Sequence, residues 1–108
     1  MKLYIAVLDD VPDYIVPTLV AHSVLGAHIK FCHHPLYTEW LNDSFKKCVL
    51  RVNRKEFCKI SEIDGVYLGH ENNTLGGIKS CAIPLPCYNI DIPNVLKFAK
   101  LWKPKSVV

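Results

Sequence analysis

The sequence has 108 residues, of which 50% are hydrophobic and 21% are charged, and its formal net charge is +3. This length fits one domain with one core, and the composition excludes an intrinsically disordered chain. No apolar run reaches the roughly 20 residues that a membrane-spanning helix needs. We therefore expect a single cytoplasmic domain over residues 1–108, without a signal peptide and without a membrane partner.

The five cysteines form no C-x-x-C pair. An odd number argues against a disulfide framework, and the wide spacing argues against a zinc site. Cys32, His33 and His34 are the one local cluster of metal-ligating residue types, but adjacent side chains point in different directions. We expect no metal and no cofactor.

The first half of the chain predicts a strand followed by two helices. Residues 2–8 are apolar on both faces, which indicates a central strand covered on both sides. Pro17 fits only the first turn of a helix, so the next element begins near residues 13–16 and ends near residue 28. Pro35 begins a second, short helix over residues 35–43. In the first helix, the positions with the spacing of a core face are Leu19, Val20, Val24 and Ala27.

The second half predicts three strands and two helices. Strands are expected over residues 46–52, 65–70 and 77–85, and Asn53 is a candidate cap for a short helix over residues 53–60. An amphipathic helix over residues 92–102 closes the chain. This order predicts an α/β fold, with a small mixed four-stranded sheet and helices on both faces.

Basic residues gather in the second half. Residues 46–108 contain eleven Lys and Arg against five acids, whereas residues 1–45 contain two against five. Such asymmetry is typical of a surface that contacts a phosphate backbone, and a lysine-rich solvated face is the alternative. The candidate nucleic-acid contacts are Lys46, Lys47, Arg51, Arg54 and Lys55.

Several segments in order resemble the type-two peptidyl-tRNA hydrolase family. The segment "YIVPTLVAHSVLGAH" (14–28) is similar to the family's first helix and keeps its A-H-small-x-x-G-A core. Residues 36–52 resemble its second helix and following strand, and residues 66–74 and 77–86 resemble its later strands and polar loop. The resemblance spans nearly the whole chain. It implies the family's fold, its action on the ester of peptidyl-tRNA and its tendency to form dimers.

The sequence departs from the family at its polar positions. Ile15 stands where the family has a lysine, Leu19 where it has a glutamine and His70 where it has an aspartate. Of the family's polar site residues, only His22 and Thr74 remain. Ester hydrolysis needs an activated water and a stabilised oxyanion, and isoleucine supplies neither.

His70 is the best replacement base, with Thr74 or Asn72 positioning the water, because histidine titrates near neutral pH. His22 is a weaker catalytic candidate, since a histidine among apolar neighbours in a helix is more often a core residue. Asp10 follows the carboxyl end of the first strand, where open α/β sheets bind ligands. A turn and a helix cap are the alternative for that aspartate. The candidate pocket residues are Asp10, Ile15, Leu19, Glu71, Asn72 and Asn73.

Two functions follow from these observations. One is a divergent hydrolase that cleaves N-blocked aminoacyl-tRNA and uses His70, Thr74 and His22. The other is a catalytically inactive module that keeps the fold and binds tRNA, a nucleotide or a protein partner. The sequence leaves both functions open. It also does not decide whether the protein forms a homodimer.

Overall fold

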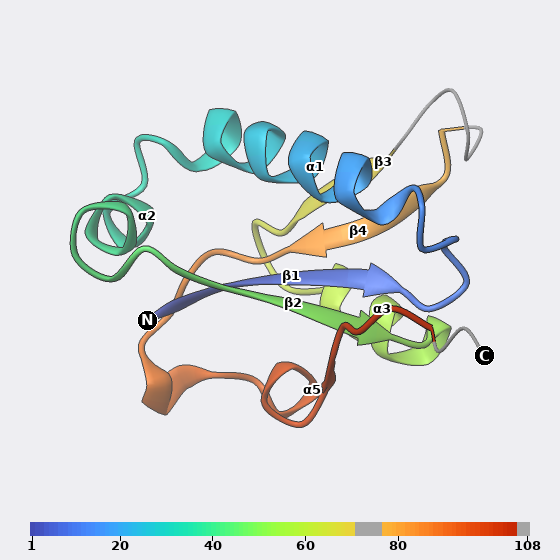
Figure 1. Cartoon of the computed structure of the whole chain (residues 1–108). Coiled ribbons are helices and arrows are strands. Elements are labelled where there is room, and N and C mark those ends of the chain that lie inside the picture. Colours follow the sequence, from blue (N-terminus) through green and yellow to red (C-terminus); the bar gives the residue numbers. More distant parts are fainter. Residues whose placement is uncertain (71–76, 106–108) are drawn as a thin grey trace.

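A computed structural model describes residues 1–70 and 77–105. In this part of the chain a mixed sheet of five strands has the order β3-β4-β1-β2-β5 (Figure 1). β1 and β2 are parallel, and the other neighbouring strands are antiparallel. The strands are β1 (Lys2–Leu8), β2 (Lys46–Val52), β3 (Tyr67–His70), β4 (Lys79–Ile83) and β5 (Lys100–Leu101). The predicted α/β class and mixed sheet are confirmed.

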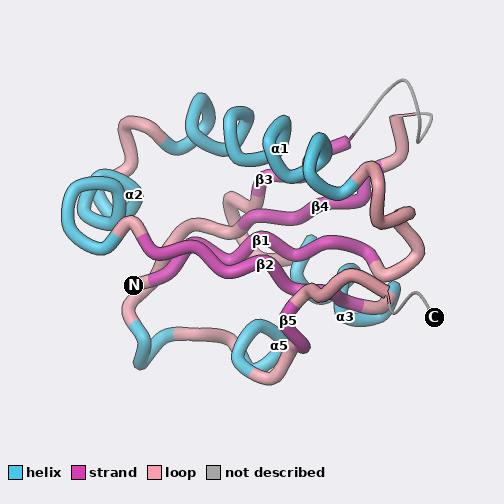
Figure 2. Tube along the Cα trace, viewed as in Figure 1, coloured by secondary structure: helices cyan, strands magenta, loops and turns pink. Residues whose placement is uncertain are grey.

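Helices cover both faces of this sheet, as predicted. Figures 1 and 2 show α1 on one side and α3 and α5 on the other. The helices are α1 (Val16–Phe31), α2 (Pro35–Glu39), α3 (Arg54–Ser61) and α5 (Asn94–Lys97), with the short turns η1 (Trp40–Ser44) and η2 (Asn89–Asp91). Within the described residues, no helix combines the length and the apolar character that crossing a bilayer would require.

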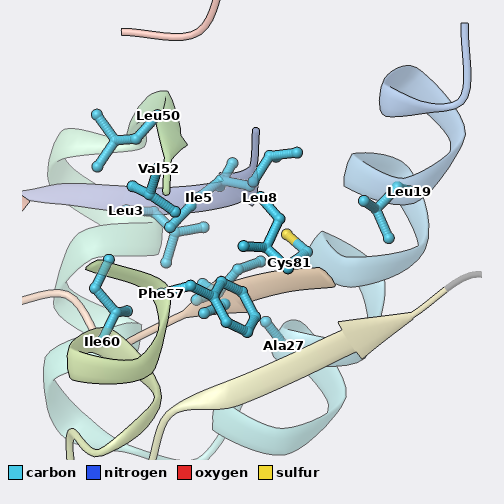
Figure 3. Close-up of a cluster of buried hydrophobic side chains, with 14 of the residues drawn as sticks. Leu3, Ile5, Leu8, Leu19, Ala27, Leu50, Val52, Phe57, Ile60 and Cys81 are labelled. Atoms are coloured by element: carbon cyan, nitrogen blue, oxygen red, sulfur yellow. The ribbon is translucent and has the colours of Figure 1, made fainter. Parts of the chain in front are cut away.

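β1 is the central strand, as its sequence predicts. Its residues from Leu3 to Leu8 are almost entirely buried, apart from Tyr4, which is half-buried. In Figure 3 the core combines Leu19 and Ala27 of α1 with Phe57 and Ile60 of α3 around the strands. Both faces of the central strand are thus covered by apolar side chains.

α1 packs very closely on β3. Its buried residues are Val16, Leu19, Ser23, Ala27 and Phe31. Gly69 of β3 lies directly under Ser23, so that a Cβ added at position 69 would lie 2.8 Å from the Ser23 Cβ. Gly26 in turn leaves room for the Tyr67 hydroxyl, which an added Cβ would overlap. Small side chains therefore set the distance between the helix and the sheet.

The helix also extends beyond the predicted end near residue 28 and ends at Phe31. The prediction was too short because Gly26 does not end the helix. It lies in the helix interior, where it accommodates Tyr67. Val20 and Val24, predicted as core residues, are only half-buried.

The C-terminal region differs most from the prediction. The helix expected over residues 92–102 is wrong, because α5 has only four residues and β5 follows it. β5 also makes the sheet five-stranded rather than four-stranded. Leu101 pairs with Leu50, and the Trp102 amide donates to the Val49 carbonyl at 2.8 Å. This pairing satisfies backbone groups that β2 would otherwise leave at an open sheet edge.

The contact between α1 and β3 predicts the effect of one added methyl group. We expect Gly69→Ala to lower the free energy of unfolding by about 1–3 kcal/mol, because the new Cβ overlaps Ser23. Urea unfolding of both proteins measures this difference. Ser23→Ala should not rescue the variant, since the Ser23 Cβ stays 2.8 Å from the added atom. A Gly69→Ala protein as stable as the wild type would contradict the close packing.

Candidate functional site at the carboxyl ends of β1 and β2

Polar residues meet where the two parallel strands end. Asp9 and Asp10 follow β1, Asn53 and Arg54 follow β2, and the register pairs Leu8 with Val52. Ligands of open α/β sheets bind at this end of the sheet, beyond the carboxyl ends of the strands. We call this surface the strand edge, and it comprises Asp9, Asp10, Arg51, Asn53, Arg54, Lys55, Glu56, Phe98 and Lys100.

The larger hollow of the strand edge has a volume of about 320 Å³. Its lining residues are Asp9, Arg51, Asn53, Glu56, Phe98 and Lys100. Asn53 and Glu56 are fixed by a reciprocal helix cap. The Asn53 side chain accepts from the Glu56 amide at 2.8 Å, and the Glu56 carboxylate accepts from the Asn53 amide at 2.9 Å. The predicted cap is therefore confirmed, and it holds both side chains beside the hollow.

The aromatic ring of Phe98 is 73% exposed at this hollow. Lys100 lies next to Arg51 in the register between β5 and β2. An exposed aromatic ring beside cations is the combination that binds nucleotides, since the ring stacks on a base and the cations approach a phosphate. The Asp9 and Glu56 carboxylates in the lining add acceptors for hydroxyl groups.

A smaller hollow of about 160 Å³ lies at the same edge. It is lined by Leu8, Asp10, Val11, Arg54, Ile78 and Ser80. Asp10 accepts from the Arg54 guanidinium at 3.3 Å, and both side chains are exposed. An exposed pair of this kind contributes little to stability. The structure thus brings together a predicted pocket residue and a predicted nucleic-acid contact.

Arg51 has a different environment from the other basic residues. Its Nη2 donates to Asp13 at 3.3 Å and to the Lys103 carbonyl, and its guanidinium lies 5.1 Å from the centre of the Trp102 ring. The Lys105 amide donates to the other oxygen of Asp13. This hydrogen bond from the Lys105 amide and the Arg51 guanidinium hold the pKa of Asp13 below its usual range. Arg51 therefore ties the C-terminal segment to the sheet.

The predicted basic residues do not form one patch. Lys46 and Lys47 begin the seven-residue strand β2, whereas Arg54 and Lys55 follow its end. At about 3.3 Å per residue, these two pairs lie about 20 Å apart. Only the second pair belongs to the strand edge. The density of basic residues along the sequence does not show that the two pairs lie at opposite ends of β2.

Sequence reasoning missed Phe98 and Lys100. Both belong to the C-terminal segment that was predicted as a helix, and their place at the strand edge depends on β5 pairing with β2. The sequence of this segment gives no strand signal, because Lys97, Lys100 and Lys103 are three residues apart and do not alternate with apolar residues.

The predicted catalytic residues lie elsewhere. His70 ends β3, and its Nδ1 lies 3.0 Å from the Lys79 Nζ on β4. A lysine ammonium can only donate, so Nδ1 is the accepting nitrogen of His70 in this contact. His22 is exposed on α1, so its interpretation as a core residue is wrong. Thr74 lies outside the described residues.

The predicted pocket residues are dispersed. Ile15 and Leu19 are core side chains, with exposed fractions of 5% and 0%. Asp10 is at the strand edge, as described above. The remaining predicted pocket residues lie outside the described part of the chain, and they are Glu71, Asn72 and Asn73.

Residues 1–70 and 77–105 contain no group of three or more His, Cys, Asp or Glu side chains placed to hold a metal ion. Neither a protein-family model nor a curated protein matches the sequence. The function is therefore inferred from the geometry of the strand edge.

The Asp13 contacts predict a pH-dependent stability. A carboxyl group with a depressed pKa stabilises the fold above its unfolded value of 3.8, and this contribution is lost as the pH falls through the lower folded pKa. We expect Asp13→Asn to be less stable than the wild type at neutral pH, with the difference disappearing in acid. Urea unfolding at a series of pH values measures it.

Asp10→Asn is the matched control, because it removes a carboxylate from an exposed pair with Arg54. Its stability should stay within about 0.5 kcal/mol of the wild type. A difference between Asp13→Asn and the wild type that is the same at every pH would contradict the role of the Asp13 charge.

Proposed function

We propose that this chain is a tRNA-binding module with a fold like that of the type-two peptidyl-tRNA hydrolase family, and that it lacks the family's ester chemistry. The order of its elements supports the likeness. A strand, two helices, a strand, a helix, two strands and a short helix follow one another, as do the segments on which the resemblance rests. The further strand β5 lies at the C-terminal end.

The burial of Ile15 and Leu19 is the observation that argues against ester hydrolysis. These residues occupy the positions of the family's lysine and glutamine, and they pack into the core. Apolar side chains in the core can neither activate a water nor stabilise an oxyanion. This supports binding rather than hydrolysis.

The strand edge supports binding of RNA. Lys55 and Lys100 are exposed there: Lys55 lies in the first turn of α3 after the capping residue Asn53, and Lys100 lines the same hollow as Asn53. Phe98 provides a face for stacking, and base–aromatic stacking is worth about 1–3 kcal/mol per base. The Asp9 and Glu56 carboxylates can accept hydrogen bonds from ribose hydroxyls, whereas they would repel a cluster of phosphates. The combination fits the end of an RNA strand, where a base and hydroxyl groups are accessible.

Removal of charge from the strand edge tests this proposal. We expect Lys55→Gln combined with Lys100→Gln to weaken tRNA binding at least about tenfold at low salt. The slope of log affinity against log salt concentration should fall by about 2, since about one counterion is released per phosphate contact. Phe98→Ala should weaken binding without changing this slope. Filter binding at several salt concentrations measures both quantities.

Lys46→Gln combined with Lys47→Gln is the matched control, because it removes the same charge from the opposite end of β2. This variant should bind tRNA nearly as well as the wild type. If only this control variant lost affinity for tRNA, the RNA would bind at the other end of β2. Absence of wild-type binding to tRNA would overturn the proposal and leave a protein partner.

A hydrolase is the second candidate, and the pairing of His70 with Lys79 favours it. The two side chains lie side by side on antiparallel strands. If Lys79 turned towards a substrate, it could stabilise an oxyanion while the freed Nδ1 of His70 accepted a proton from water. In the arrangement observed, Lys79 occupies that nitrogen.

Incubation with N-acetyl-aminoacyl-tRNA decides between the two candidates. We expect the wild-type protein to cleave the ester no faster than His70→Ala and the protein-free control do. Acid precipitation of labelled N-acetyl-aminoacyl-tRNA measures the cleavage. Cleavage by the wild type that both His70→Ala and Lys79→Ala abolish would establish the hydrolase instead.

A further inference from the structure

A second feature lies at the opposite end of β2 and is chemically unlike the strand edge. A groove of about 430 Å³ lies between α1 and the segment formed by α2 and η1. Its walls are mainly apolar and include Val24, Leu25, Tyr37, Trp40, Leu41 and Phe45. This volume and lining fit a binding groove for apolar side chains.

The outer face of α1 continues this apolar surface. Leu25 is 63% exposed at the groove, and Ile29 is exposed one turn further along the helix. Lys30 is the only Lys, Arg, Asp or Glu residue in α1. A helix at a protein surface usually presents charged residues to solvent, whereas exposed apolar faces mark interaction sites.

Phe45 is held at the groove in an unfavourable backbone conformation. Its φ angle is 55°, and it is the only non-glycine residue with a positive φ among those described. Glycine or asparagine would end η1 with less strain. What phenylalanine adds is a ring that stacks on Trp40, with centroids 5.4 Å apart, and that remains 55% exposed. Backbone strain of this kind is found at ligand-binding positions.

Lys47 places a positive charge against this apolar surface. Its Nζ lies 3.2 Å from the centre of the Phe45 ring and donates to the Phe45 carbonyl at 2.8 Å. In the described part of the chain Lys47 makes no ion pair, and the groove lining contains no carboxylate. An ammonium group has three N–H donors, so Lys47 can also pair with an acidic residue of a bound molecule.

We infer that this groove binds an acidic amphipathic helix of a partner protein. Apolar residues spaced three and four apart would enter between Leu25 and Trp40, and a carboxylate beside them would pair with Lys47. Charge complementarity disfavours the α1 face of a second copy of this chain. That face carries His22, His28 and Lys30 but no carboxylate. The inference does not depend on RNA binding at the strand edge.

Two designed helical peptides test the inference. Both carry leucines at positions i, i+4 and i+7, flanked in one peptide by glutamates and in the other by lysines. We expect the wild-type protein to bind the fluorescent glutamate peptide at least tenfold more tightly than the lysine peptide, as measured by fluorescence anisotropy. Lys47→Glu should reduce or reverse this preference, because it exchanges the sign of the charge in the groove. Leu25→Asp should weaken binding of the glutamate peptide at least tenfold.

Ile90→Asp and Lys55→Glu are the matched controls, because Ile90 is 92% exposed and neither residue lines the groove. Both should bind the glutamate peptide as the wild type does. Leu25→Asp should keep its affinity for tRNA, which separates failure at the groove from failure at the strand edge. Circular dichroism of each variant checks that it is folded.

Three outcomes would overturn the inference. One is equal binding of both peptides by the wild type and by Lys47→Glu. Another is a wild-type dimer, seen by sedimentation, that Leu25→Asp dissociates, since the groove would then be covered by a second copy. The third is binding of anionic phospholipid vesicles that Leu25→Asp abolishes, with no binding of either peptide, which would assign the surface to a membrane.

Discussion

The close contact between α1 and β3 is the constraint on which the rest of the structure depends. Gly69 lies under Ser23, and Gly26 lies over Tyr67, so the helix packs nearer to the sheet than larger side chains would permit. Burial beneath this contact raises the pKa of the Cys81 thiol to about 12. That thiol is therefore protonated at neutral pH and unreactive. The same contact orients α1, so that its remaining apolar residues face outward beside α2.

The second organising feature is the attachment of the C-terminal segment to β2. β5 pairs with Leu50 and Arg51 of β2 at one edge of the sheet, and the contacts of Arg51 with Asp13 and Trp102 hold the segment in place. Phe98 and Lys100 reach the carboxyl ends of the parallel strands only because of this pairing. A contact that satisfies the backbone at a sheet edge thus also assembles the polar hollow.

The two ends of β2 have different chemistry. At its carboxyl end, cations, carboxylates and an exposed ring surround a polar hollow, which suits a nucleotide. At its beginning, Lys47 lies on aromatic rings beside an apolar groove, which suits an amphipathic helix. The strand separates these surfaces by about 20 Å, so a ligand bound at one of them would leave the other accessible. Neither surface is lined by Ile15, Leu19 or His70, the positions at which the family that the sequence resembles has polar groups.

Local patterns in the sequence determined most of the elements. The apolar run of residues 2–8, the proline in the first turn of α1 and the Asn53 cap each report interactions between near neighbours, and all three are found in the structure. Only the tertiary structure decided where β5 pairs, that Ile15 is buried, and that Lys47 and Arg54 lie on different surfaces. These outcomes depend on contacts between residues far apart in the sequence. Such contacts leave no periodic signal, because their energy comes from the partner strand or helix and not from the segment itself.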